Sequence, residues 1–267
     1  MDNRSRIVVI RDGIIRFMML NSMTKILPLY VVTEYPKSGG TWLSQMVSEY
    51  LDIPLPRSTY PKLVSSLITE HLLYSPLMHN VICMHRDGRD IIVSLYYYSL
   101  FQNELNSPYL VNRTRKDLPF SDFDDIKGNL SKFIQYLYDR DAKSMSPFRF
   151  TWPEFENSWE GRGTVHIKYE DLILNGLPTL ARVIKKVTNR PIDENKLRNI
   201  YEKFSFKNQS KRDSGVEKKT SFLRKGKPGD WLYKFDKRSG NLFNELAGKT
   251  LIRLGYEKDD SWINKLK

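Results

Sequence analysis

The pattern that most limits the fold of this chain is a strand, a glycine-bearing turn and a helix in direct succession. Leu29–Thr33 (LYVVT) is a short run rich in β-branched residues, as expected of a buried parallel strand. Pro36, Gly39 and Gly40 then interrupt the chain, and Thr41–Leu51 places apolar residues at helical spacing. These three parts form half of a βαβ unit, so the sequence predicts an α/β protein with a parallel sheet.

The rest of the chain repeats this alternation. Asn80–Met84 (NVICM) and Thr164–Tyr169 (TVHIKY) are predicted strands, whereas Asn103–Asp125 and Lys207–Gly229 are predicted to be irregular. Apolar residues at helical spacing predict further helices at 91–101, 177–188, 193–204 and 241–254. We therefore expect one domain over residues 29–267, preceded by an N-terminal extension, residues 1–28, that the sequence does not assign to a structure.

The chain is strongly basic and contains one cysteine. Its 43 Lys and Arg against 31 Asp and Glu give a net charge of +12, which indicates an anionic ligand such as a nucleotide, an acidic glycan, a nucleic acid or a membrane surface. Cys83 lies in an apolar run, where we expect a packed core thiol. A lone cysteine excludes an internal disulfide framework and is typical of a reducing compartment. With no apolar run long enough to span a membrane, we expect a cytoplasmic protein.

The turn Tyr35–Trp42 (YPKSGGTW) has the composition of an anion-binding loop. Successive backbone N–H groups running into a helix N-terminus bind anions, and the two glycines allow close approach. Ser38 and Thr41 add hydroxyl donors, and Lys37 adds a positive charge. The usual nucleoside-triphosphate loop has its lysine directly after a glycine, whereas here the lysine precedes both glycines.

This loop resembles the 5′-phosphosulfate loop of sulfotransferases that use 3′-phosphoadenosine 5′-phosphosulfate (PAPS), with Gly40 in place of a threonine. Three further segments resemble that family in its order along the chain: RDGRDIIVS with Arg86 and Ser94, HIKYEDL with Tyr169, and FLRKGKPGDW with Arg224. The resemblance extends over roughly 29–256. It implies a three-layer α/β/α fold with a central parallel sheet, of the P-loop nucleotide-kinase type.

The resemblance also implies which residues bind PAPS. Guanidinium groups pair with phosphate oxygens through two parallel hydrogen bonds, which suits a 3′-phosphate site, and Ser94 would add a donor from the first turn of its helix. The implied PAPS-binding residues are Lys37, Ser38, Gly39, Gly40, Thr41, Trp42, Arg86, Ser94, Tyr169, Phe206, Arg224, Lys225 and Gly226.

The implied catalytic residues are Lys37, His71 and Ser94. Lys37 would stabilise the leaving phosphate, and a histidine suits the role of base near neutral pH. His71 lies where the family has its catalytic histidine, although Glu70 replaces the usual threonine or serine before it. His79 and His85 remain alternative bases.

The predicted reaction transfers a sulfuryl group from PAPS to a hydroxyl or amine, releases PAP and requires no metal. The alternatives are a P-loop phosphotransferase and a basic binding module for nucleic acid or acidic glycan; for the predicted enzyme we expect no nucleic-acid partner. The acceptor is predicted to be a small molecule, a glycan or a lipid alcohol. Tyr96–Tyr98, Asn103–Asp125 and Phe148–Trp159 could form its pocket, since aromatic side chains suit sugars and phenols alike.

Overall fold

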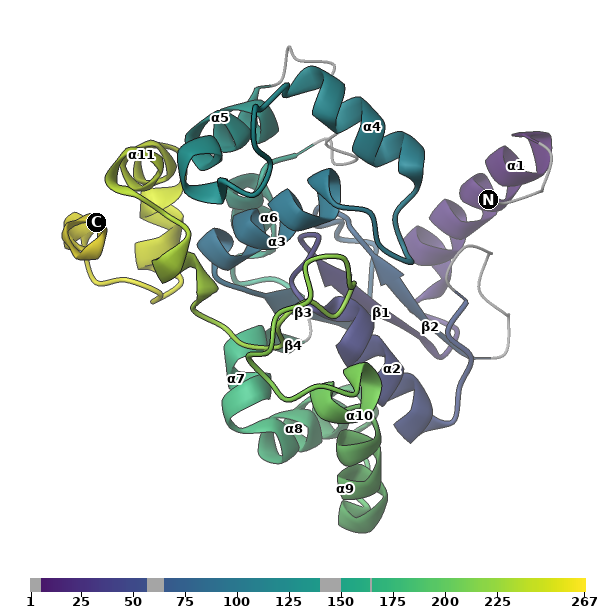
Figure 1. Ribbon diagram of the computed structural model, residues 1–267. Helices are drawn as coiled ribbons and strands as arrows, with labels where there is room; N and C mark the ends of the chain where they lie inside the picture. Colours follow the sequence, from purple (N-terminus) through teal and green to yellow (C-terminus); the bar gives the residue numbers. More distant parts are fainter. Residues whose placement is uncertain (1–5, 57–64, 140–149, 164) are drawn as a thin grey trace. The chain divides into compact units, whose positions relative to one another are not determined.

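The computed structural model describes residues 6–56, 65–139, 150–163 and 165–267 (Figure 1). The chain divides into two units. Unit 1 consists of Met1–His85 and Ser158–Gln209, and unit 2 consists of Arg86–Asn157 and Ser210–Lys267. None of the described helices is long and apolar enough to cross a membrane.

Unit 1 contains a parallel sheet with strand order β2-β1-β3-β4. The strands are β1 (Leu29–Glu34), β2 (Ser66–Glu70), β3 (Val81–His85) and β4 (Val165–Lys168). Every neighbouring pair is parallel. The order changes direction between β1 and β3, and ligands of open parallel sheets bind beyond the carboxyl ends of the strands at such a point.

The helices of unit 1 cover the sheet. They are α1 (Arg6–Met18), the π-helical turn η1 (Met19–Met23), α2 (Gly40–Leu51), α7 (Tyr169–Leu174), α8 (Gly176–Thr188), α9 (Glu194–Lys203) and α10 (Phe206–Ser210), whose last residue belongs to unit 2. α2 contacts β1 and β2, α8 contacts β4, and α9 contacts both helices. In Figure 1 these three helices lie on the same side of the strands. Val32, Ile82 and Val165 form one row across the sheet and are buried in the core under these helices.

Unit 2 is helical. It contains α3 (Gly88–Leu100), α4 (Pro108–Asp117), α5 (Ile126–Tyr138), α6 (Trp152–Trp159), η2 (Asp230–Tyr233), α11 (Lys237–Arg253) and η3 (Asp260–Lys265). The last two residues of α6 belong to unit 1. α3 contacts α4, α5, η2 and α11, so it is the central helix of this unit.

The α/β class with a central parallel sheet and flanking helices is confirmed. The predicted strands correspond to β1, β3 and β4, apart from Thr164, which lies outside the described residues. The predicted helices correspond to α2, α3, α8, α9 and α11. The domain boundary at residues 28 and 29 stays a prediction.

The prediction that Asn103–Asp125 is irregular was wrong, because α4 begins at Pro108. Proline is well suited to the first turn of a helix, where its missing N–H would have no intrahelical partner. The Ser107 side chain caps this helix by accepting a hydrogen bond from the N–H of Leu110. The proline therefore starts a helix here and does not interrupt one.

A buried arginine connects the two ends of unit 2. Arg89, in the first turn of α3, pairs with Asp87 at 2.7 Å and with Glu257 at 2.6 Å. Its guanidinium carbon lies 3.5 Å from the centroid of the Trp231 ring. Burial alone would lower the pKa of Arg89, but the two carboxylates raise it above its ordinary value. The cation is therefore held in the charged state inside the unit.

Arg89→Ala is expected to lower the free energy of unfolding by about 3–5 kcal/mol, because it removes the cation that pairs with the buried carboxylate of Asp87. Urea unfolding followed by circular dichroism measures this change. The control is Arg238→Ala at an exposed position, which should change the free energy by less than about 0.5 kcal/mol. A similar decrease in the free energy of unfolding in both variants would contradict a particular contribution of the buried Arg89 cation to stability.

Candidate functional site

The Tyr35–Trp42 loop joins the carboxyl end of β1 to the N-terminus of α2. Gly39 caps α2 with φ +97° and ψ +12°, and its carbonyl accepts the N–H groups of Trp42 and Leu43. Lys37 also has a positive φ, +73°. A lysine in the left-handed region is uncommon, and such conformations are concentrated at functional sites. The loop thus has the backbone geometry expected of an anion site at a helix N-terminus.

Ser38 supports this interpretation. Its side chain is completely buried in the loop, and its hydroxyl oxygen has no hydrogen-bond partner among the described residues. A buried hydroxyl without a partner costs about 1–3 kcal/mol. An oxygen of a bound anion would satisfy it.

Glu34 is part of this loop, although the sequence analysis did not identify it. Its carboxylate is 4% exposed and accepts the backbone N–H of Gly40 at 2.6 Å. An ideal Cβ on Gly40 would lie 2.6 Å from the Glu34 Cδ. The carboxylate therefore occupies the space that a threonine would need at residue 40. Glu34 and Gly40 are steric and hydrogen-bonding partners, which explains why this loop has a glycine where the loop that it resembles has a threonine.

His71 lies beside the start of the loop. It directly follows β2, whose Glu70 is opposite Thr33 in the sheet. The His71 Nδ1 is 3.0 Å from the backbone carbonyl of Glu34. A carbonyl can only accept, so Nδ1 carries the hydrogen and Nε2 of the neutral ring carries the lone pair. A proton-accepting atom is thus held next to the anion-binding loop.

The two alternative histidines are placed differently. His79 precedes β3 at the amino edge of the parallel sheet, and its backbone N–H donates to Thr24 Oγ1 at 3.0 Å. This edge is opposite the one that carries the loop, which argues against His79 as the base. His85 ends β3, and its Nε2 lies 2.8 Å from Nδ1 of His166.

Two of the predicted adenine-binding aromatics, Tyr169 and Trp42, lie beside Gly39. An ideal Cβ there would lie 2.8 Å from Cδ2 of Tyr169, so the tyrosine ring packs directly against the glycine. The Trp42 ring meets Tyr169 edge-on with centroids 6.2 Å apart. Trp42 Nε1 donates to the Phe204 carbonyl at 2.7 Å, two residues before Phe206. Trp42 and Tyr169 are therefore in contact with each other, and Phe206 follows close along the chain.

In unit 2, Asp90 links the start of α3 to the end of the basic segment. Its carboxylate accepts the N–H groups of Gly229 at 2.6 Å and of Trp231 at 3.0 Å. Burial raises the pKa of Asp90, and the opposing attraction of Arg86 lowers it less. Ser94 is half-buried in the second turn of α3, not the first, because the helix begins three residues earlier than predicted.

Two of the predicted phosphate-binding cations of unit 2, Arg224 and Lys225, are paired with carboxylates. Arg224 lies 2.7 Å from Asp230 and also pairs with Glu217, and its guanidinium carbon is 4.4 Å from the centroid of the Tyr97 ring. Lys225 pairs with the same Asp230. Burial alone would raise the pKa of Asp230, but Arg224 and Lys225 lower it below its ordinary value. These cations are therefore fixed in place, with part of their charge already balanced.

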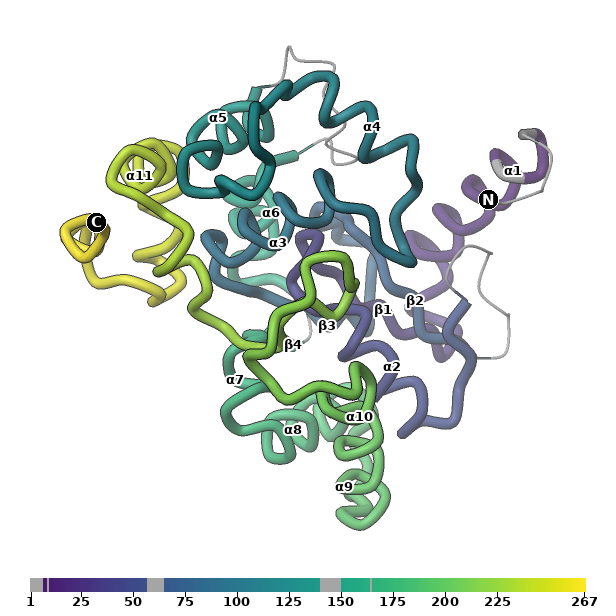
Figure 2. The backbone as a smooth tube through the Cα atoms, viewed as in Figure 1, coloured from purple at the N-terminus to yellow at the C-terminus, as the bar shows by residue number. Residues whose placement is uncertain are grey.

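Backbone hydrogen bonds hold the Arg224–Gly226 turn in a folded loop. Between α10 and η2 the chain runs outward and returns (Figure 2). The N–H of Gly215 donates to Lys225 at 2.8 Å, and Ser214 Oγ donates to Gly226 at 2.7 Å. Gly226 has φ +64°, which favours glycine at this turn.

Several aromatic residues predicted to line an acceptor pocket are core residues instead. Tyr96, Trp152 and Phe155 are at most 1% exposed, and the Tyr96 hydroxyl donates to the Phe123 carbonyl at 2.9 Å. Trp159, in unit 1, is buried as well. Phe148 lies outside the described residues. Aromatic composition did not distinguish a core from a pocket wall, because both contain large apolar rings.

Comparison with known proteins places this site in context. The sulfotransferase domain family matches residues 53–255, which is most of the chain and begins after the Tyr35–Trp42 loop. Mouse Sulfotransferase 2B1 is 25% identical over 237 residues, covering 82% of this chain and 62% of that protein. The chain thus spans about three fifths of the length of this relative.

Two solved structures share the fold. Mouse sulfotransferase SULT7A1 complexed with PAP has a TM-score of 0.58 at 16% identity, covering 93% of each chain. Retinol dehydratase in complex with androsterone and inactive cofactor PAP has a TM-score of 0.56 at 16% identity, covering 90% of this chain and 85% of that one. At such identities the likeness concerns the fold.

Gly40→Thr is expected to lower the free energy of unfolding by about 1–3 kcal/mol, because the added side chain collides with the buried Glu34 carboxylate. In the double variant Glu34→Ala/Gly40→Thr this obstruction is removed. The decrease in the free energy of unfolding of the double variant should therefore be smaller than the sum of the decreases in the two single variants. Urea unfolding of the four proteins measures the coupling, and additivity within about 0.5 kcal/mol would contradict the steric explanation.

Proposed function

Because the chain belongs to the sulfotransferase domain family, we propose that it transfers a sulfuryl group from PAPS to an acceptor hydroxyl or amine and releases PAP. One observation carries this proposal. His71 is hydrogen-bonded to the carbonyl of Glu34, so a base stands beside an anion-binding loop at the carboxyl edge of the sheet. Such a pair supplies both parts that the transfer needs, a bound donor and a base for the acceptor.

We assign one group of residues to each end of PAPS. In unit 1, Lys37–Thr41 would hold the phosphosulfate, and Trp42, Tyr169 and Phe206 would contact the adenine. The partnerless Ser38 hydroxyl and the left-handed Gly39 support the first assignment. In unit 2, the 3′-phosphate would be held by Arg86, Ser94, Arg224, Lys225 and Gly226.

The proposed reaction is an in-line displacement. His71 Nε2 removes the acceptor proton as the acceptor oxygen attacks sulfur, and the bond from sulfur to the bridging phosphate oxygen breaks. Lys37 stabilises the negative charge that develops on the departing PAP. By analogy with phosphoryl transfer, positioning and electrostatic stabilisation supply most of the rate. None of these steps requires a metal.

Glu34 adds a constraint on this mechanism. Its carboxylate accepts one N–H group at the α2 N-terminus, Gly40 N–H, which a phosphosulfate oxygen would otherwise use. The donor then depends more strongly on Ser38, Thr41 and Lys37. We infer that Lys37 contributes a large share of the 5′ affinity in this protein.

For the acceptor we propose a small molecule, supported by retinol dehydratase, whose structure contains androsterone. Glycan and lipid alcohols remain candidates for the same role. We also propose a cytoplasmic location, supported by a composition with a single cysteine, which is usual in reducing compartments.

The transfer assay uses labelled PAPS with a panel of phenols, sterols, sugars and lipid alcohols, scored by mass spectrometry. His71→Ala is expected to abolish transfer and leave PAP affinity nearly unchanged, because the imidazole acts on the acceptor. Lys37→Ala is expected to lower kcat by about a hundredfold to a thousandfold, the usual effect of removing one transition-state donor.

His79→Ala and Lys258→Ala serve as matched controls, because both side chains are exposed and neither has an assigned role. Retained turnover in His71→Ala would move the base to another residue. Polyanion binding with a steep salt dependence, without preference for PAP over ATP, would instead favour a nucleic-acid or glycan-binding module.

Arg224→Lys is expected to weaken PAP binding about tenfold, because an ammonium cannot form the two parallel hydrogen bonds that a guanidinium makes with phosphate. Isothermal titration calorimetry measures the affinity. Arg238→Lys is the exposed control and should leave it unchanged. Equal PAP affinity in Arg224→Lys and the unchanged protein would remove Arg224 from the 3′-phosphate site.

A further inference from the structure

Three side chains with metal-binding atoms lie on one face of the sheet in unit 1, on neighbouring strands. Cys83 on β3 is directly opposite His166 on β4, and His85 is two residues beyond Cys83. Residues two apart on a strand point to the same face. None of the three is assigned to PAPS, and the proposed base is His71, to which His85 was only an alternative.

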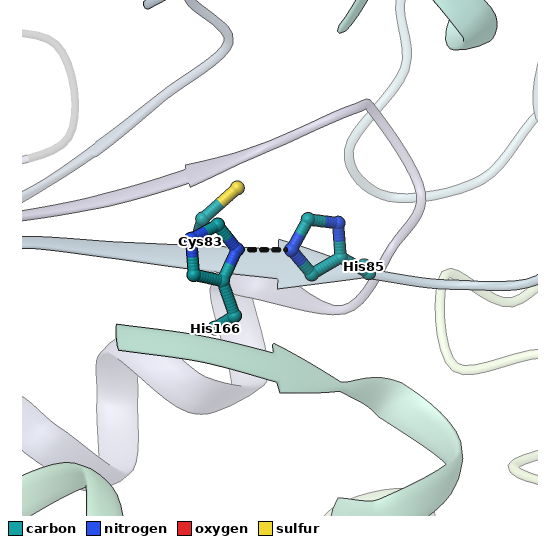
Figure 3. Close-up of side chains that lie close together, drawn as sticks. All are labelled: Cys83, His85 and His166. Carbon is teal, nitrogen blue, oxygen red and sulfur yellow. Dashed lines mark hydrogen bonds between the residues drawn. The ribbon is translucent and has the colours of Figure 1, made fainter. Parts of the chain in front are cut away.

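The potential ligand atoms of this Cys83–His85–His166 cluster lie within 4.8 Å of one another. Figure 3 shows the cysteine sulfur beside the hydrogen bond that joins the two imidazole rings. The rings are nearly parallel, with an interplanar angle of 11°. A thiol and two imidazole nitrogens therefore converge on one small region.

The hydrogen bonds determine which nitrogen of each ring bears hydrogen. His166 Nε2 makes a short hydrogen bond to the backbone carbonyl of Arg162. Since a carbonyl only accepts, Nε2 carries the hydrogen, and Nδ1 of the neutral ring presents its lone pair towards His85. Metal-bound histidines usually donate their other N–H to a carbonyl or carboxylate in this way. His166 is thus already oriented as a metal ligand would be.

We propose that Cys83, His85 and His166 bind a transition-metal ion of the zinc type, with water in the remaining coordination position. One thiolate and two imidazoles suit Zn²⁺, Co²⁺ or Cu⁺, whereas Mg²⁺ and Ca²⁺ require oxygen ligands. Binding forms one metal–sulfur and two metal–nitrogen bonds. The Cys83 thiol releases its proton to solvent, and His85 moves its hydrogen from Nε2 to Nδ1, so one proton is released per ion.

Metal binding requires the two imidazoles to turn and move slightly apart, because the Nε2–H of His85 now points at Nδ1 of His166. The two facing nitrogens are 2.8 Å apart. In a tetrahedral zinc site with bonds near 2.0–2.1 Å they would be about 3.3 Å apart. Cys83 and His85 are buried, whereas His166 is partly exposed and can rotate slightly. Lys168 lies opposite His85 in the sheet. Its positive charge repels a metal cation, and the negative charge of the Cys83 thiolate offsets this repulsion.

A bound ion would connect β3 to β4. The three ligands have this geometry only in the folded protein. An ion that binds them should therefore raise the melting temperature of the protein. This effect requires neither PAPS nor an acceptor. The proposed metal site can therefore be tested independently of the proposed transfer reaction.

The experiment titrates Co²⁺ into the reduced protein without a polyhistidine tag. Because Cys83 is the sole cysteine of the chain, any thiolate-to-cobalt charge-transfer absorption must come from this residue. The expected result is that band with one ion bound per chain, and competition by an equal amount of Zn²⁺. Zn²⁺ should also raise the melting temperature, whereas Mg²⁺ should not.

Cys83→Ser should abolish the charge-transfer band, and His166→Gln should weaken Co²⁺ binding at least about tenfold. His79→Ala removes a histidine outside the cluster and should leave both measurements unchanged. The unchanged protein provides the test even if a core variant fails to fold. Absence of the band at millimolar Co²⁺, or unchanged affinity in a folded His166→Gln protein, would overturn the proposal.

Discussion

Parallel pairing of β1 with β2 and β3 is the constraint on which the rest of unit 1 depends. Because the strands run in the same direction, the chain leaves each of them at the same edge of the sheet. The Tyr35–Trp42 loop, His71 and His85 therefore reach that edge from three different strands, while His79 is left at the opposite one. The parallel topology thus separates His79 from His71 and His85, which lie at the edge of the sheet that carries the loop.

At the N-terminus of α2 a carboxylate of the protein itself takes part in the anion loop. Glu34 accepts the N–H of Gly40, and its side chain fills the space beside that glycine. The same residue supplies the carbonyl that orients His71. The side chain of Glu34 thus contacts the Tyr35–Trp42 loop, and its backbone carbonyl contacts the proposed base, His71.

In unit 2, several basic side chains are paired with carboxylates of the protein itself. Arg89 is buried between two carboxylates and two tryptophans and serves the structure. Arg224 and Lys225 both pair with Asp230. A net charge of +12 therefore does not measure the charge available to a ligand, because part of it is balanced inside the fold.

The sequence by itself determined β1, the loop and α2, because β-branched residues, paired glycines and helical spacing are local signals. It also indicated the residue types of the two proposed anion sites. Only the tertiary structure decided that Glu34 faces Gly40, that Tyr96 and Trp152 are core residues, and that Cys83 lies opposite His166. These relations depend on strand register and packing between segments far apart in the chain, which no local pattern encodes. The helix at Pro108 was missed for a local reason, since a proline that starts a helix is read as one that interrupts it.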